Sequence, residues 1–122
     1  MRRSWIVGLT LAYLATLAAN RSQLVVRGAS MEPTLQAGDR LLTVPVFGRA
    51  LRAGLLVVVA DPVDATHLVV KRIARIDGDR IVVLGDAPDR STDSRQWGPV
   101  PRTSVRRIVV ARWPDLTTPL HH

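Results

Sequence analysis

The chain has 122 residues and a formal net charge of +7; 47% of its residues are hydrophobic and 22% are charged. This composition excludes a disordered polymer, and the length allows one domain with a small core. Basic residues are spread along the sequence and aromatic residues make up 4%, so neither a basic stripe nor stacking platforms predict a nucleic-acid partner. The chain lacks cysteine, and its three histidines lack His-Glu-x-x-His spacing, so we expect no disulfide, metal site or cofactor.

The amino-terminal region is the first predicted element. Residues 4–19 carry no charge and lie between Arg3 and Arg21. As a helix this segment would span about 24 Å, less than the ~30 Å hydrocarbon core, so its polar flanks must snorkel or the bilayer must thin. We expect residues 1–20 to form one retained transmembrane anchor, with its amino end inside and residues 21–122 outside as a β-rich domain. A cleavable signal peptide is the alternative interpretation, because the basic start and the small residues at 18–19 also suit one.

The rest of the chain predicts a mainly β fold. Short runs rich in valine, isoleucine and leucine alternate with Gly, Pro and Asp turn signals, and no helical periodicity is present. The predicted strands are Gln23 to Arg27, Arg40 to Val46, Leu55 to Ala60, His67 to Ile76, Arg80 to Leu84 and Val105 to Trp113. Asp77-Gly78-Asp79 joins two of these runs over a very short gap and predicts a hairpin. We expect a compact antiparallel β-barrel or sheet.

One long segment, Gly85 to Pro101, has no strand character. Its hydroxyl groups and Asp/Arg pairs could form a polar network beside a functional site. From composition alone, a solvated and charge-balanced surface connection is the better interpretation.

Lys71 is the only lysine, against sixteen arginines, and it lies in the apolar run 68–73. A lysine desolvated by hydrophobic neighbours can lose its proton and act as a general base, which arginine cannot. Ser30, in a Gly- and Pro-bounded turn after residues 24–26, is a candidate nucleophile. His67 would face the same side of its strand as Lys71 and is the competing base. A solvated surface lysine is the alternative that involves no chemistry.

Three segments in order resemble the type I signal peptidases, membrane-anchored serine/lysine endopeptidases, in a short Gram-positive or actinobacterial-like form. Residues 28–35, Gly-Ala-Ser-Met-Glu-Pro-Thr-Leu, resemble the family's nucleophile box. Residues 69–73, Val-Val-Lys-Arg-Ile, resemble its lysine box, and residues 85–101 resemble its closing box. The resemblance covers nearly the whole chain and implies a mainly antiparallel β fold.

The resemblance implies a role for each matching residue. Ser30 would be the nucleophile, with its backbone amide as oxyanion donor, and Lys71 the general base. Ser91 would orient the lysine, and Asp93 and Arg95 would form an ion pair that braces the loop. The implied substrate-binding residues are Met31, Gly28 and Val70, with Met31 forming a wall of a shallow apolar pocket for a small side chain.

Two positions depart from the family pattern. Gly28 stands where some members carry a serine hydroxyl as a second oxyanion donor, and such a donor is worth roughly 3 to 4 kcal/mol elsewhere. Ala87 stands where asparagine commonly follows Gly-Asp, which removes a hydrogen bond from the loop. His121 and His122 are interpreted as a tag remnant or a frayed tail.

The expected function is therefore a plasma-membrane, single-pass serine endopeptidase with its catalytic domain on the extracytoplasmic side. It would cut N-terminal signal peptides from exported pre-proteins after small residues, with membrane lipid as its other partner. The substrate would bind extended along Val26 to Gly28 and Leu68 to Val70. The alternatives are a protease that matures a nickel superoxide dismutase precursor, and a non-catalytic, membrane-tethered β-domain that binds peptides.

Overall fold

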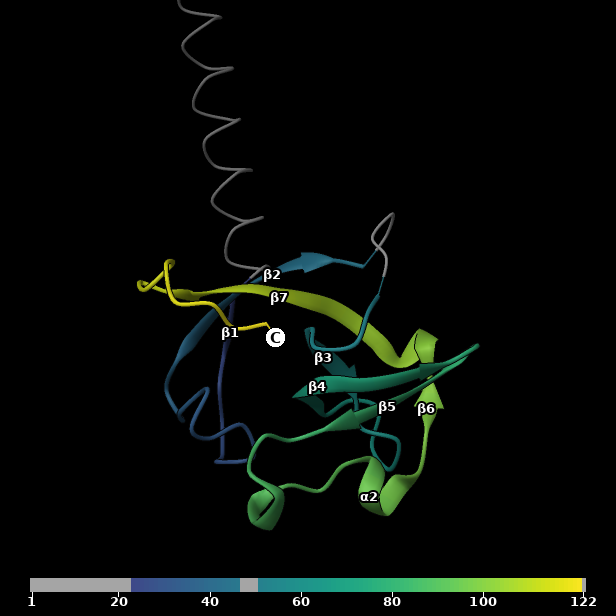
Figure 1. Ribbon diagram of the computed structural model, residues 1–122. Coiled ribbons are helices and arrows are strands. Elements are labelled where there is room, and N and C mark those ends of the chain that lie inside the picture. Colours follow the sequence, from purple (N-terminus) through teal and green to yellow (C-terminus); the bar gives the residue numbers. More distant parts are fainter. Residues whose placement is uncertain (1–22, 47–50, 122) are drawn as a thin grey trace, which may run out of the picture.

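A computed structural model describes residues 23–46 and 51–121 of the chain (Figure 1). The expected anchor, residues 1–20, lies outside this range. Within the described residues, no helix is both long and apolar enough to cross a bilayer.

Seven antiparallel strands form one curled sheet in the order β1-β2-β7-β3-β4-β5-β6. They are β1 (Gln23–Val25), β2 (Arg40–Pro45), β3 (Leu56–Ala60), β4 (Leu68–Asp77), β5 (Arg80–Leu84), β6 (Val100–Pro101) and β7 (Val105–Trp113). The mainly β prediction is confirmed, and all six predicted strands are present. The predicted first strand was two residues too long, because the backbone turns away after Val25.

The predicted hairpin is the β4–β5 pair. Its register runs from Asp77 opposite Arg80 to Arg72 opposite Leu84. Gly78 has a φ of 63°, a left-handed conformation that glycine adopts without steric cost, so the short turn can close here. The hairpin thereby brings Gly85, the next residue after Leu84, beside the part of β4 that contains Lys71.

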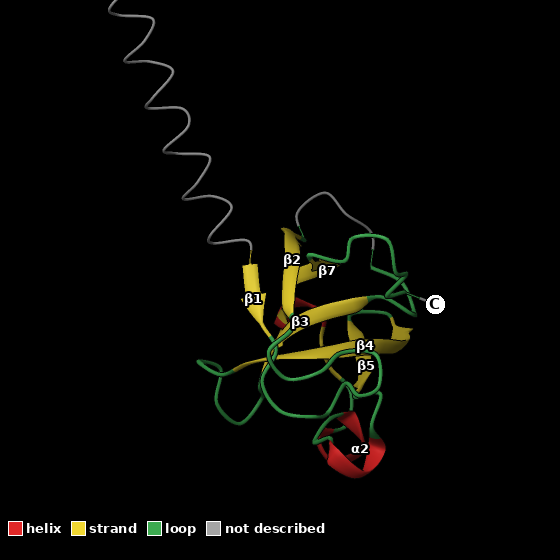
Figure 2. Cartoon of the chain, turned by 90° about the vertical axis from the view of Figure 1, so that its left-hand side faces the viewer, coloured by secondary structure: helices red, strands yellow, loops and turns green. Residues whose placement is uncertain are grey.

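The central strand β3 is buried on both faces, as expected from its unbroken Leu-Val-Val-Val-Ala run. Leu56 and Val58 belong to one core cluster, whereas Val57 and Val59 belong to the other. The sheet therefore curls around two separate cores, and β4 runs beside β3 along both of them (Figure 2).

The prediction that residues 85–101 form an unstructured, solvated connection was wrong. The segment contains the 3₁₀ turn η1 (Pro88–Arg90), the one-turn helix α2 (Ser94–Trp97) and strand β6. Asp93 caps α2 by accepting from the Arg95 amide, and the Gln96 side chain accepts in return from the Asp93 amide. This reciprocal capping box gives the segment local order that composition did not reveal. A second 3₁₀ turn, η2 (Arg102–Ser104), leads into β7.

The chain after β7 folds back onto the core, so the interpretation of His121 as part of a frayed tail was wrong. Leu120 is 4% exposed and belongs to the first core cluster. The Leu56 amide donates a hydrogen bond to His121 Nδ1 at 3.0 Å. Apolar burial and a backbone hydrogen bond together fix this end against β3. His122 lies outside the described residues.

Candidate active site

Lys71 lies near the middle of the sheet and is 3% exposed. Its register partner on β3 is Val57, and Ile73 on the same strand is fully buried. Because side chains alternate along a strand, Lys71 faces the second core cluster together with Val69 and Ile73. The amine therefore ends in an apolar environment, where Nζ donates a hydrogen bond to Ser91 Oγ at 3.1 Å.

Ser91 is in turn held by Asp93, which has no exposed surface. Ser91 Oγ donates to Asp93 Oδ2 at 2.5 Å, and the Gly85 amide donates to the same oxygen at 2.8 Å. Arg95 adds a guanidinium contact to Oδ2 at 3.0 Å and a backbone amide contact to Oδ1 at 3.0 Å. One buried carboxylate thus accepts four hydrogen bonds and fixes the hydroxyl that contacts Lys71.

The electrostatics of this cluster lower the pKa of both Lys71 and Asp93. Burial lowers the pKa of Lys71, and Arg95 lowers it further, whereas Asp93 and Asp61 act in the opposite direction. Burial alone would raise the pKa of Asp93, but its hydrogen bonds from Ser91, Gly85 and Arg95 and the Arg95 charge leave it lowered. The dominant cause for Lys71 is desolvation, as expected for an ammonium group between valine and isoleucine side chains.

Ser30 lies in a turn that contacts the same cluster through its backbone. The Ala87 amide donates to the Ser30 carbonyl at 2.9 Å. A Cβ atom added at Gly85 would lie 2.6 Å from that carbonyl oxygen and still closer to Ser91 Oγ. Gly85 is therefore packed between the Ser30 backbone and the side chain that contacts Lys71. Gly85, which leaves no room for a methyl group, thus lies between the Ser30 backbone and Ser91, whose hydroxyl contacts Lys71.

An open groove of about 500 Å³ passes Ser30. One wall is formed by residues 24–27 with Ser30 and Met31, and the other by residues 67–70. Of the residues predicted to bind substrate, Val70 and Met31 line this groove, whereas Gly28 is absent from the lining. Gly28 has a φ of 77° and open space around it, so its structural role is to let the backbone turn between β1 and Ser30.

The sequence analysis missed a second ion pair beside the site, between buried Arg72 and half-buried Asp86. Arg72 binds Asp86 with two hydrogen bonds, at 3.0 and 2.7 Å, and Asp86 also accepts from Thr34 Oγ1 at 2.5 Å. Arg72 Nη1 further donates to the carbonyls of Gly54 and Leu120. The signal available in the sequence was an arginine at an apolar-flanked strand position next to Lys71. This pair connects the Ser30 turn to β4 and to the carboxyl-terminal segment.

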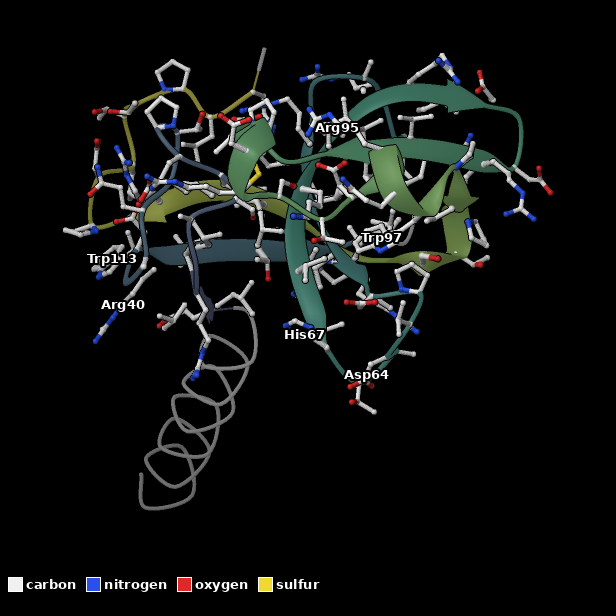
Figure 3. All side chains as sticks on the ribbon, turned by 90° about the horizontal axis from the view of Figure 1, so that it is seen from below. Arg40, Asp64, His67, Arg95, Trp97 and Trp113 are labelled. Atoms are coloured by element: carbon white, nitrogen blue, oxygen red, sulfur yellow. The ribbon has the colours of Figure 1, made fainter. Side chains whose placement is uncertain are left out.

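His67, the competing base, lines the groove, but its side chain is 64% exposed and lies 3.6 Å from Asp61. Figure 3 shows it at the start of β4, near Asp64 in the preceding loop. Among the described residues, no group of three or more histidine, aspartate or glutamate side chains could hold a metal ion.

Comparisons with known proteins identify the family to which the chain is similar. The family described as "Signal peptidase, peptidase S26" matches residues 2–87, a range that includes Ser30 and Lys71 and ends before Ser91. "Mitochondrial inner membrane protease subunit 1" of Schizosaccharomyces pombe is 34% identical over 71% of this chain and 70% of its own length. "Mitochondrial ATP-independent inner membrane protease subunit 1a" of Arabidopsis thaliana is 33% identical over 73% of this chain and 68% of its own.

The family match and the alignments with these relatives each extend over most of the chain, and the family match includes both candidate catalytic positions. The chain belongs to the signal peptidase family, peptidase S26. The family assignment based on the three sequence segments is confirmed.

Proposed function

We propose that this peptidase is a serine endopeptidase in which Ser30 is the nucleophile and Lys71 the general base. The observation that carries the proposal is the buried Lys71 amine, 3.1 Å from Ser91 Oγ, beside the one glycine that also contacts the Ser30 backbone. Nucleophile, base and a third group that orients the base are the parts that activated-serine catalysis requires.

The hydrogen bonds around Ser91 leave the lone pair of a neutral Lys71 available. Ser91 has one hydroxyl proton, and it is donated to Asp93. Ser91 can therefore only accept a hydrogen bond from Lys71, in either charge state of the amine. The lone pair of the neutral amine is not used by this contact, so it can accept the Ser30 proton. Asp93, through Ser91, orients the amine.

Catalysis would proceed by acyl transfer. Ser30 Oγ attacks the substrate carbonyl carbon as its proton passes to Lys71, and the ammonium group then protonates the leaving amine as the C–N bond breaks. Water, deprotonated by Lys71, hydrolyses the resulting ester of Ser30. The Ser30 backbone amide is the proposed donor to the oxyanion. Burial lowers the pKa of Lys71, so the free base is more abundant near neutral pH than for an exposed lysine.

The groove suits an extended peptide. Within the described residues β1 pairs only with β2, and Leu68–Val70 pairs only with β3, so both walls present strand edges. A peptide can add its backbone to such edges. Met31 and Val70 contribute apolar lining to this groove, and we propose that they contact a small substrate residue before the cut.

We further propose that the substrates are exported pre-proteins and that residues 1–20 anchor domain 21–122 to the outer face of the plasma membrane. The relatives named as inner-membrane proteases support a membrane location, and the uncharged run 4–19 supports an anchor.

The test is cleavage of a pre-protein with an Ala-x-Ala site by detergent-solubilised wild type, Ser30→Ala and Lys71→Ala, with circular dichroism to show that all three are folded. Defined cleavage by the wild type alone is expected. Cleavage by all three would refute the assignment of both residues. Cleavage by none would favour a protease with one dedicated substrate or a non-catalytic binder.

A further inference from the structure

The chain after β7 turns back toward the centre of the sheet, and its carboxyl end lies beside β3 (Figure 1). We call this segment, residues 114–121, the strap. Near its start, Asp115 accepts hydrogen bonds from the backbone amides and hydroxyl groups of two threonines that follow it, an arrangement typical of a tight turn. At its far end Leu120 is buried, and His121 Nδ1 accepts a hydrogen bond from the Leu56 amide at 3.0 Å. The strap is therefore held at both ends.

The start of the strap connects to the turn that contains Ser30, residues 28–39. The Arg112 guanidinium donates one hydrogen bond to Asp115 and another to the Thr34 carbonyl, each at 3.3 Å. One cation at the end of β7 thus binds the strap and the Ser30 turn together.

The far end of the strap reaches the same threonine through the second ion pair of the site. The Leu120 carbonyl accepts a hydrogen bond from Arg72 Nη1 at 2.9 Å. The same guanidinium binds Asp86, and Asp86 accepts a hydrogen bond from Thr34 Oγ1 at 2.5 Å. The strap therefore closes a ring of polar contacts that joins the Ser30 turn to β4 beside the proposed base.

Apolar packing links the strap to the Ser30 turn as well. The first core cluster contains Leu120 together with Met31 and Leu35, two buried residues of that turn. It also contains Val70, which lines the substrate groove with Met31. Removal of Leu120 from this cluster would leave unfilled space among the residues that support the turn.

We propose that the strap positions the Ser30 turn for catalysis and that His121 is the positioning residue that keeps the strap docked. This inference rests on the proposed role of Ser30 as the nucleophile. The register between β3 and β7 begins at Val57, so the Leu56 amide lies just beyond that ladder and takes His121 as its acceptor. Leu56 is fully buried, and a buried amide that loses its acceptor destabilises the docked state.

His121 accepts this hydrogen bond only while Nδ1 is unprotonated. Burial lowers the pKa of His121 from the ordinary value of 6.5, and the cationic groups of Arg52 and Arg72 act in the same direction, whereas the carbonyls of Val109 and Gly54 act in the opposite direction. The imidazole is therefore neutral near pH 7. Docking of the strap is complete there and weakens as the pH falls below 6.5.

Two substitutions of His121 separate its acceptor from its bulk. His121→Asn keeps an acceptor on a short planar side chain, whereas His121→Leu has an apolar side chain without one. Cleavage of the Ala-x-Ala pre-protein would be measured at a temperature where thermal unfolding shows each protein to be folded. We expect kcat to be about tenfold lower in His121→Leu, with KM within about twofold of the wild type, and both constants of His121→Asn to stay within about twofold. An unchanged kcat in His121→Leu, or an equal loss in both variants, overturns the proposal.

The pH profile is a readout that a merely structural role would not change. Protonation of Lys71 lowers kcat/KM in the wild type and in His121→Asn alike, but only the wild type also loses the acceptor for the Leu56 amide in acid. The ratio of kcat/KM in the wild type to that in His121→Asn should fall about threefold between about pH 7.5 and about pH 5. A constant ratio overturns the role of His121.

Amide hydrogen exchange tests the strap without requiring activity. The Ala87 amide donates to the Ser30 carbonyl at 2.9 Å, so its exchange rate reports how firmly the Ser30 turn is held. It should exchange about tenfold faster in His121→Leu than in the wild type or His121→Asn. The control is the Arg102 amide, which donates to the Asp79 carbonyl in the β4–β5 turn and should not change. Equal Ala87 exchange in all three proteins overturns the proposal, whereas the expected exchange pattern in a wild type that cleaves nothing supports the hold of the strap on the turn and contradicts the proposed function.

Discussion

Two segments meet at the site, and they are held in place in different ways. The closing segment, residues 85–99, is organised around one buried carboxylate, Asp93, that accepts hydrogen bonds from Ser91, Gly85 and Arg95. The turn containing Ser30, residues 28–39, depends mainly on neighbouring elements for its position. Its hydrogen bonds to them include those of the Ala87 amide to the Ser30 carbonyl, Thr34 to Asp86, Arg90 to Glu32 and Arg112 to the Thr34 carbonyl.

The difference implies that the two partners of the proposed catalytic pair respond differently to substitution. The orientation of the Lys71 amine depends on a short chain of charge-assisted bonds, so one change there affects the base strongly. The Ser30 turn has several weaker ties, so the loss of one displaces the nucleophile less. Exposed ion pairs such as Arg90 with Glu32 contribute little, whereas bonds to a buried carboxylate contribute more.

The largest effect is expected at Lys71, where charge and chemistry can be separated. Lys71→Met keeps the length and removes the ionisable group, so kcat should fall by about 10³-fold or more. Lys71→Arg should be equally inactive, because a guanidinium cannot be deprotonated. Thermal unfolding should show Lys71→Met at least as stable as the wild type near pH 7, since a buried, desolvated amine is replaced by an apolar chain. Substantial activity in either variant would contradict the role of Lys71 as the general base.

Gly85→Ala tests whether the two segments must touch. The added methyl group would overlap Ser91 Oγ and the Ser30 carbonyl. We expect a loss of about 1 to 3 kcal/mol in the free energy of unfolding and about 10²-fold in kcat. The control is Gly78→Ala, where a positive φ is strained but no atom lies near; it should lose some stability and no activity at a temperature where it is folded. Equal kinetics in the two variants would show that the close contact does not matter.

Asp93→Asn weakens the organisation of the closing segment without changing its shape. The loss of charge-assisted bonds should cost about 2 kcal/mol in the free energy of unfolding at neutral pH. The pKa of Asp93 is lower in the folded protein than in the unfolded chain, where it is near 3.9. The ionised carboxylate therefore stabilises the fold above that pH, and this stabilisation is lost as the pH falls through the pKa of the folded state. Chemical denaturation should therefore show the gap between wild type and variant closing below about pH 4.

The same substitution should also affect catalysis. Asp93 raises the pKa of Lys71, so the alkaline rise of kcat/KM should move to lower pH in Asp93→Asn, together with a roughly tenfold loss of kcat. The exposed neighbour Asp89→Asn is the control and should leave both profiles unchanged. If the pH profile of the variant were identical to that of the wild type, Asp93 would not influence the pKa of Lys71.

The smallest effect is expected in the Ser30 turn. Thr34→Val removes the hydroxyl that donates to Asp86 and preserves the side-chain shape, so it should cost about 1 kcal/mol in the free energy of unfolding. Because other ties remain, kcat should fall only about threefold. Arg90→Ala, which breaks an exposed pair, should change stability by less than about 0.5 kcal/mol. If Thr34→Val lost as much free energy of unfolding as Asp93→Asn, the two segments would not differ in how they are held in place.

Local patterns in the sequence predicted the strands and the hairpin. Val57 and Ile73 are on strands because valine- and isoleucine-rich runs bounded by turn residues suit a buried sheet. The order within residues 85–101 was not predictable from composition, because it depends on Asp93 being buried by a fold that brings Gly85 and Arg95 to it. The docking of Leu120 and His121 depends on contacts more than 45 residues away in sequence.

The candidate site was predicted mainly from the family resemblance, with Lys71 and Ser30 also indicated by their own surroundings. The Arg72–Asp86 pair was missed. Alternation along the strand predicts that the Arg72 side chain points to the other face of the sheet from Lys71, but it does not identify the residue that Arg72 contacts there. The roles of Ser30, Lys71, Ser91, Met31 and Val70 stay predictions until kinetics test them.

The pKa of Lys71 can be measured directly, because the chain has a single lysine and selective isotope labelling of the lysine side chain gives one resonance. An NMR titration of the full chain in detergent, with Ser30→Ala to prevent self-cleavage, would follow that resonance with pH. We expect a pKa clearly below the usual value of 10.5, caused by burial of the amine. A pKa at or above 10.5 would mean that Lys71 is charged in the working enzyme and would contradict its role as the base.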